Sequence, residues 1–228
     1  MLRSTLTPAP LSDPATLDIR CAAVCFDLDG VLVDSTAQIQ EVITRWAAVQ
    51  GVDLTGLHAA ARSMTDREFV ATAAPHLDPA AEAAAIQRLE VESATDTRPL
   101  PGALRAYNAV PAAARAIVTS GARPVVLARL AAARIPAPRA LVTAEDVTYG
   151  KPHPQPYLDA VRRLGRTAGE CVALEDSHNG ALAAKLAGLT VIGVGSRGTD
   201  LAATADYLVQ DMSELCFTIG AGTAEVRC

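Results

Sequence analysis

The sequence predicts an α/β fold: a Rossmann-like parallel sheet with helices on both faces, and a small all-helical domain inserted into it. Three observations lead to this prediction. Short apolar runs alternate with helical stretches after residue 100. The segment 35–98 is rich in Ala and shows no alternating strand pattern. A chain of 228 residues is long enough for one large domain, or for a domain with a small insertion.

The N-terminal residues 1–20 are expected to form a flexible tail, because Pro8, Pro10 and Pro14 stand among Ser and Thr and little of this segment can be buried. The fold then opens at Cys21 with a short apolar strand, which runs into an acidic loop ending in glycine. We therefore assign residues 21–34 and 99–228 to the α/β core.

The inserted helical domain is expected over residues 35–98. Ser35 precedes Gln38 in the pattern of a capping box, which indicates a helix start. Apolar residues then recur at helical spacing until Gly51 ends the helix; they are Ile39, Val42, Ile43 and Trp46. Pro75 and Pro79 break the rest of the segment into shorter helices.

The other strands of the sheet are predicted from five apolar runs that alternate with helical stretches. They span residues 116–119, 140–143, 171–174, 190–194 and 206–209. In an open parallel sheet, ligands bind beyond the carboxyl ends of the strands. Residues that directly follow these strands are therefore the first candidates for a functional site.

Composition and charge exclude several classes of protein. Half of the residues are hydrophobic and a fifth are charged, as in globular proteins. A net charge of -5 leaves no basic surface for nucleic acid. No apolar run is long enough for a membrane span or a signal peptide. The five cysteines form no CxxC pair, so we expect reduced thiols in a cytoplasmic protein.

Two aspartates, Asp27 and Asp29, follow the first predicted strand. Their spacing points both side chains to the same side if the backbone stays extended, and Gly30 then allows a turn. Neighbouring carboxylates repel each other, which favours a bound cation or a shared proton. One can act as a nucleophile while the other transfers protons. The alternative for such a pair is a simple turn.

Two positions further along the chain could hold an anion such as phosphate. Ser120 and Gly121 lie between a predicted strand and a predicted helix start. The free N–H groups at the start of a helix attract anions. The alternative for Ser120 is a plain N-cap. Lys151 lies in a loop before a helix and offers a compact positive charge. The alternative, a solvated surface lysine, fits Lys185 better; these two are the only lysines among 20 basic residues.

Acidic residues reappear after the predicted strand 171–174, at Glu175 and Asp176. With Asp27 and a backbone carbonyl, they could complete the oxygen ligands of Mg²⁺, and a substrate phosphate would fill the remaining positions. The alternative is a capped helix. All these candidates follow strands on the same predicted sheet edge, which favours a single site.

Two other patterns carry less weight. Gly193–Gly198 matches GxGxxG after a strand, but residues 199–205 allow barely two helical turns, so a flexible connection is predicted rather than a dinucleotide site. The four histidines, His58, His76, His153 and His178, show no metal-ligand spacing. Among them, His178 stands beside the acidic pair, near the expected substrate entrance.

In this order, the segments resemble the motifs of the haloacid dehalogenase-like (HAD) superfamily, over roughly residues 21–210. Residues 26–35 (FDLDGVLVDS) look like the first motif, 118–121 (VTSG) like the second, 150–154 (GKPHP) like the third and 175–177 (EDS) like the fourth. The helical insertion is similar to the cap of the subfamily that contains beta-phosphoglucomutase and the small sugar- and polyol-phosphate phosphatases.

The resemblance implies a Mg²⁺-dependent phosphatase of small phosphorylated sugars or polyols. Asp27 would form an aspartyl-phosphate, and Asp29 would protonate the leaving alcohol and then activate water. Ser120, Gly121 and Lys151 would hold the phosphoryl group. Mg²⁺ would be bound by Asp27, the carbonyl of Asp29, Asp176 and, directly or through another ligand, Glu175. Arg62 in the cap is an expected substrate contact, and we expect a monomer or a weak homodimer.

Two alternatives to a phosphatase stay open. The first is a phosphosugar mutase. Beta-phosphoglucomutase has a serine and a lysine soon after the second-motif serine, where this chain has Ala122 and Arg123, and this difference weakens the mutase alternative. The second is a catalytically silent binding protein, which intact motif residues argue against. Dehalogenases lack the second acid of the first motif, so Asp29 argues against halide chemistry.

Overall fold

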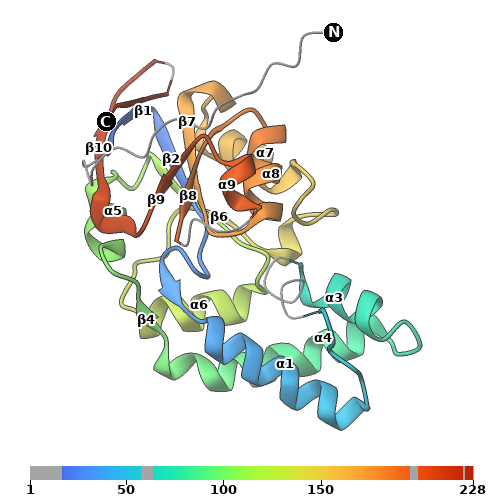
Figure 1. Cartoon of the computed structure of the whole chain (residues 1–228). Coiled ribbons are helices and arrows are strands. Elements are labelled where there is room, and N and C mark those ends of the chain that lie inside the picture. The colour runs from blue at the N-terminus through green and yellow to red at the C-terminus, as the bar shows by residue number, and fades with distance from the viewer. Residues whose placement is uncertain (1–16, 58–63, 196–199, 223, 228) are drawn as a thin grey trace, which may run out of the picture.

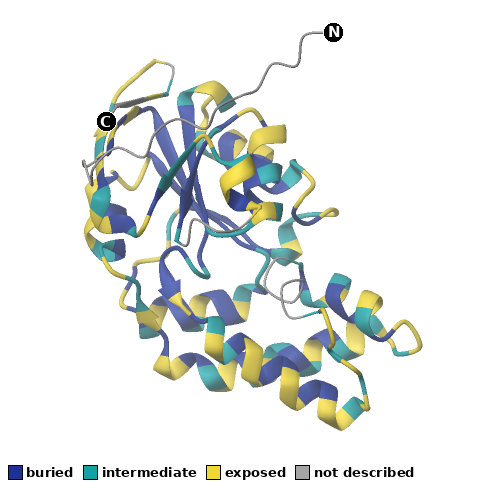
Figure 2. Cartoon of the chain, in the orientation of Figure 1, coloured by how far each residue is buried: buried dark blue, intermediate teal, exposed yellow. Residues whose placement is uncertain are grey.

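A computed structural model describes residues 17–57, 64–195, 200–222 and 224–227 of the chain. It shows an α/β core with a group of helices on one side (Figure 1). The buried residues concentrate in the strands of the core and on the inward faces of the helices (Figure 2). Within the described ranges, no helix has the length and apolar character needed to cross a membrane.

The main sheet confirms the predicted parallel α/β fold. In the described part of the chain it has six strands, all paired in parallel, in the order β6-β5-β2-β7-β8-β9. Their bounds are β2 Ala23–Phe26, β5 Arg115–Val118, β6 Ala140–Val142, β7 Cys171–Glu175, β8 Thr190–Val194 and β9 Tyr207–Val209. Every residue of β2, β5 and β7 is buried, as expected for parallel strands covered on both faces.

Helices and a second sheet cover the two faces of the main sheet (Figure 1). On one face, α7 (Gln155–Leu164) packs on β5 and β6, and α8 (His178–Leu186) packs on β7 and β8. On the other face, the ring of Phe26 in β2 lies 5.3 Å from Tyr107 of α5 (Ala103–Ala109). The same ring lies 6.3 Å from Phe217 of the second sheet.

The second sheet corrects the prediction of a tail through residue 20. Residues 17–20 belong to β1 (Leu17–Cys21), which pairs in parallel with β10 (Leu215–Ile219) and antiparallel with β11 (Glu225–Arg227). Burial alternates along β1, as a half-buried strand requires. The partner strand β10 lies almost a whole chain length away in sequence, so local composition did not reveal this pairing. Residues 1–16 lie outside the described residues.

The segment between β3 (Val33–Asp34) and β4 (Arg98–Pro99) is helical, as expected, although Arg98 itself belongs to a strand. Among its described residues, the helices are α1 Thr36–Gln50, α3 Asp66–Ala73, α4 Pro79–Ser93 and the 3₁₀ turn η1 Ala94–Asp96. They enclose a separate cluster of buried side chains, in which Trp46 lies edge-on to Phe69 at 6.0 Å. Because β3 and β4 pair, the two connections to the core run side by side.

The capping box predicted at Ser35 is wrong. Ser35 does occupy the N-cap of α1, but its hydroxyl makes no bond to the helix. It donates instead to the carboxylate of Asp29, at 2.6 Å. A hydrogen bond donated to a carboxylate is charge-assisted, so the hydroxyl is oriented toward the acidic loop and accepts no bond from the first turn of α1.

The remaining elements are short apart from α6 (Arg123–Ala132), which follows β5. They are η2 Ala144–Asp146, η3 Ala168–Glu170, α9 Leu201–Thr204 and η4 Met212–Glu214. The loops that connect strands to α6, α7 and α8 open at the carboxyl edge of the sheet, and the predicted site residues lie there.

Candidate active site

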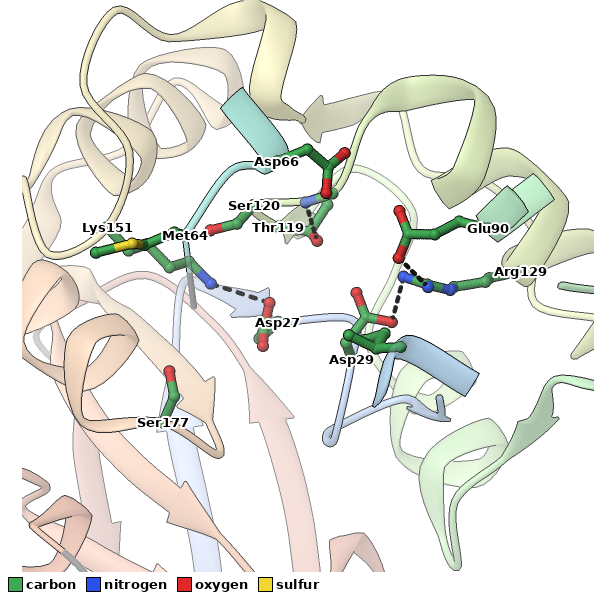
Figure 3. A pocket seen from close by; sticks show the side chains of 12 residues that line it. Asp27, Asp29, Met64, Asp66, Glu90, Thr119, Ser120, Arg129, Lys151 and Ser177 are labelled. Atoms are coloured by element: carbon green, nitrogen blue, oxygen red, sulfur yellow. Dashed lines mark hydrogen bonds and ion pairs between the residues drawn. The ribbon is translucent and has the colours of Figure 1, made fainter. Parts of the chain in front are cut away.

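The loop after β2 brings Asp27 and Asp29 to one pocket, which both side chains line (Figure 3). The N–H of Asp27 donates to the carbonyl of Leu174 at 3.0 Å, which extends the pairing with β7 by one residue. The chain then turns at Gly30, whose φ of +82° is a conformation that glycine adopts readily. The two aspartates therefore converge, as their spacing predicted.

Lys151 is a buried residue of this pocket, so the interpretation as a solvated surface lysine is wrong. Its ammonium donates to Asp27 Oδ1 at 2.9 Å, to Glu175 Oε1 at 2.5 Å and to the carbonyl of Val118 at 3.0 Å. Only 5% of the residue is exposed. Lys185, by contrast, lies on the surface and pairs with Asp206 at 2.5 Å.

The charges of this cluster shift the pKa values of its members. Burial raises the pKa of Asp27 well above its ordinary value; the charge of Glu175 adds to this effect, and Lys151 opposes it. Burial alone would lower the pKa of Lys151, but Asp27 and Glu175 raise it above the usual lysine value. The lysine is therefore charged at neutral pH and stabilises the ionised form of Asp27.

Three carboxylates offer oxygens that could hold a metal ion. Ligand oxygens of Asp27, Glu175 and Asp176 lie within 4.8 Å of one another. Glu175 is fully buried, and its Oε1 accepts from both Lys151 and the hydroxyl of Tyr157, the latter at 2.5 Å. Hard oxygen ligands of this kind suit Mg²⁺.

Glycine 30 makes room for one of these carboxylates. A Cβ at this position would stand 2.1 Å from Oδ2 of Asp176. The acidic loop after β2 and the acidic pair after β7 therefore approach each other only because residue 30 lacks a side chain. The backbone carbonyl of Asp29 lies in the same turn.

Ser120 lines the pocket across from Asp29 (Figure 3), and Gly121 also lines it. The N–H of Gly121 donates to the hydroxyl of Thr119 at 3.0 Å, which shapes the turn after β5. The alternative of a plain N-cap for Ser120 is wrong, because α6 begins at Arg123 and Ala122 is its N-cap. The second-motif residues are thus held in a turn beside the acidic loop.

Three charged residues that were not predicted from the sequence also line this pocket: Asp66, Glu90 and Arg129. Arg129, which is 1% exposed, donates to Asp29 Oδ1 at 2.9 Å and to Glu90 Oε1 at 2.8 Å. Asp66 and Glu90 come from the helical segment, in α3 and α4. One signal was available: Arg129 follows Val125 by four residues, which places an arginine on the apolar face of its helix.

The carboxylates from the helical segment are held in an environment that favours their protonated forms. Burial raises the pKa of Asp66 to about 8, and the charge of Glu90 contributes to the same shift. Burial also raises the pKa of Glu90, while the neighbouring Arg129 opposes that shift. The pocket wall opposite Lys151 is therefore acidic, with Arg129 as the cation that balances it.

Other predicted features lie outside the described residues or are not among those that line this pocket. Arg62 and His58 lie outside the described residues. His178 is exposed, and its ring contacts Thr204 at 2.8 Å on the side of α9, away from the acidic cluster. The GxGxxG pattern lies partly outside the described residues, and the helix that follows, α9, has four residues, fewer than a dinucleotide site needs.

The parallel sheet, with a pocket of carboxylates and a buried lysine at its carboxyl edge, defines an α/β enzyme. A family model described as haloacid dehalogenase-like hydrolase matches residues 21–188. Hexitol phosphatase A of Escherichia coli (strain K12) is 37% identical over 182 residues, which cover 77% of this chain and 84% of the relative. The chain belongs to the haloacid dehalogenase-like hydrolase family, as its motifs predicted.

Other relatives agree with this assignment. Glycerol-1-phosphate phosphohydrolase 1 of Saccharomyces cerevisiae is 36% identical over 105 residues, which are 42% of this chain and 42% of the relative. Among solved structures, CbbY from Rhodobacter sphaeroides in complex with phosphate has a TM-score of 0.75 at 26% identity. That likeness covers 85% of this chain and 96% of CbbY, so the helical segment belongs to the shared architecture.

Proposed function

We propose that the protein is a Mg²⁺-dependent phosphatase that hydrolyses small phosphorylated sugars or polyols through an aspartyl-phosphate. One observation carries the proposal: Asp27, Asp29, Ser120 and Lys151, from three separate segments, meet in a single pocket. Opposite charges are thereby placed around a space where a phosphate ester can react.

Asp27 acts as the nucleophile in this proposal. Its carboxylate oxygen forms a bond to phosphorus while the bond from phosphorus to the alcohol oxygen breaks, and Asp29 gives its proton to that oxygen. Asp29 then takes a proton from water as the water oxygen attacks phosphorus. This second step releases inorganic phosphate and restores the carboxylate of Asp27.

Lys151, with Ser120 and Gly121, holds the phosphoryl group in this proposal. The ammonium already contacts Asp27 at 2.9 Å, so it lies beside the atom where the new bond forms. A lysine offers a point charge to the phosphoryl oxygens as negative charge accumulates on them. Glu175 fixes the ammonium from the other side, at 2.5 Å.

The proposed metal ligands are Asp27, Asp176 and the carbonyl of Asp29, with Glu175 binding either the ion or only Lys151. The oxygens of the three carboxylates lie close enough together to share one ion. When bound, Mg²⁺ neutralises charge on the transferring phosphoryl group. Burial, and then the charge of Glu175, raises the pKa of Asp27, and a bound cation would stabilise the ionised forms of these acids.

The helical segment is proposed as a cap over the substrate. It contributes Ile39, Met64, Asp66 and Glu90 to the pocket. The relatives that are named as hexitol and glycerol-1-phosphate phosphatases support a polyol phosphate as the substrate. Arg62 of the same segment stays a proposed substrate contact.

The test is phosphate release from hexitol phosphates, glycerol 1-phosphate and hexose phosphates, with Mg²⁺ and with EDTA. Replacing Asp27→Asn should abolish turnover, because an amide cannot form the acyl-phosphate. Asp34→Asn is the matched control, since Asp34 is an exposed aspartate just beyond the same loop. Turnover by the Asp27 variant, or full activity in EDTA, would contradict the proposal. An isomerised phosphosugar without free phosphate would replace it with a mutase.

A further inference from the structure

Arg129 is the most deeply buried charged group of the pocket to which the proposed reaction gives no role. It lies in α6, on the face that also carries the buried Val125, Val126 and Leu130. Replacing a buried ion pair by apolar residues is often neutral or stabilising. An arginine on this apolar face therefore calls for an explanation other than stability, and its contacts supply one.

The guanidinium bridges two carboxylates (Figure 3). One terminal nitrogen donates to Asp29 Oδ1 at 2.9 Å, and the other donates to Glu90 Oε1 at 2.8 Å. Both terminal nitrogens are thus engaged by protein groups, so Arg129 is not arranged to receive the phosphoryl group. Lys151 occupies that role on the opposite side of Asp27.

The contacts to Asp29 distinguish its two oxygens. Oδ1 accepts from Arg129 and from the hydroxyl of Ser35, at 2.9 and 2.6 Å. Oδ2 instead faces the turn that follows β5, where a Cβ on Gly121 would lie 3.9 Å from it. One oxygen is therefore held by the protein, and the other points to the proposed phosphoryl site.

We propose that Arg129 is a positioning residue for Asp29: by holding Oδ1 it aims Oδ2 at the alcohol oxygen that leaves phosphorus. This inference rests on the proposed phosphatase function. In the step concerned, the proton on Asp29 moves to the alcohol oxygen as the bond from that oxygen to phosphorus breaks and Asp27 bonds to phosphorus. Because Glu90 belongs to α4 of the helical segment, the orientation of Asp29 also depends on the packing of α4 against α6.

The choice of leaving group separates a positioning role from a structural one. The alkoxide released from a polyol phosphate leaves slowly unless an acid protonates it. The nitrophenolate released from p-nitrophenyl phosphate is a stable anion and leaves without a proton from the enzyme. We compare kcat/KM for glycerol 1-phosphate and for p-nitrophenyl phosphate, since kcat/KM reports the steps up to loss of the alcohol. A structural defect lowers both values together, but a misplaced acid lowers only the first.

The first variant is Arg129→Lys, which keeps the charge but lacks the planar fork needed to bridge two carboxylates. We expect kcat/KM for glycerol 1-phosphate to fall by about 10-fold to 100-fold, and that for p-nitrophenyl phosphate by less than about 3-fold. Arg115→Lys is the matched control, because Arg115 is another buried arginine that donates to the carbonyls of Tyr107 and Val110 and has no carboxylate partner among the described residues. Its ratio of the two kcat/KM values should equal that of the wild type.

A second variant, Glu90→Gln, leaves Arg129 in place and removes the charge that anchors it; it is used if the lysine variant does not fold. We expect a smaller loss, again confined to glycerol 1-phosphate. Equal losses on both esters, or no loss on either, would overturn the positioning role while leaving the phosphatase proposal intact. A wild-type protein that hydrolyses neither ester would defeat the proposed function, and this inference with it.

Discussion

Replacing Lys151 with methionine should destabilise the folded protein, because it removes an ammonium that lies between two buried carboxylates. The ammonium is 2.9 Å from Asp27 and 2.5 Å from Glu175, and 5% of the lysine is exposed. Methionine retains most of the apolar length of the side chain. The substitution therefore tests the charge more than the packing.

The size of the effect follows from the burial of these groups. Leaving a buried charge without its partner costs about 3–5 kcal/mol. In a chain of 228 residues, this corresponds to a fall in Tm of roughly 6–20 °C. Lys185→Met is the control, since Lys185 is 39% exposed in its pair with Asp206 and should contribute less than about 1 kcal/mol.

The loss should also depend on pH. Burial already raises the pKa of Asp27, with a contribution from Glu175, and Lys151 is the group that opposes the shift. Lys151→Met removes that opposition, so Asp27 in the folded variant keeps its proton to a higher pH than in the wild type, whereas the unfolded chain releases it above a pH of about 4. Stability therefore falls as the pH rises, and the loss caused by Lys151→Met should be larger at pH 8 than at pH 5.

Urea denaturation in EDTA, at pH 5 and pH 8, measures this difference directly. The free energy of unfolding is compared for the wild type, the Lys151 variant and the Lys185 variant. A loss below about 1 kcal/mol at pH 8, or equal losses for the two variants, would refute the view of Lys151 as a buried counterion.

Two further substitutions test the acidic loops of the pocket. Gly30→Ala places a Cβ 2.1 Å from the Asp176 carboxylate, at a φ of +82°. Because Asp176 is a proposed Mg²⁺ ligand and must move, the Mg²⁺ concentration for half-maximal activity should rise by about 10-fold. An unchanged Mg²⁺ titration would contradict the proposal that Asp176 binds the ion. Asp66 has a pKa raised to about 8, chiefly by burial and then by Glu90, so it destabilises the wild type as the pH rises from 5 to 8. The stability of Asp66→Asn relative to the wild type should therefore increase over that range in urea denaturation, and a constant difference would show that Asp66 titrates normally.

The parallel sheet could be predicted because each of its strands contains a short apolar run. Buried parallel strands lack alternation, and runs such as 171–174 and 190–194 are bounded by turns and helices that make them recognisable. The candidate site followed from the same topology. Since all strands point the same way, the residues after β2, β5 and β7 had to meet at one edge.

Predictions failed where a residue's role depends on a partner outside its own helix or strand. Ser35 has the local pattern of a capping residue, yet its hydroxyl bonds Asp29. Residues 17–20 have the composition of a tail, yet they pair with a strand near the other end of the chain. In both cases a tertiary contact replaced the local preference, and only the folded chain supplies that contact.

By itself, the sequence predicted the alternating strands and helices of the main sheet, the acidic and basic residues at its edge, and the family to which the chain belongs. Tertiary structure alone decided that Lys151 is buried between two acids, and that Arg129 joins Asp29 to Glu90 across a span of residues 29–129. The reason is physical. Periodicity and turn chemistry act over a few residues, whereas burial and charge pairing depend on how whole elements pack.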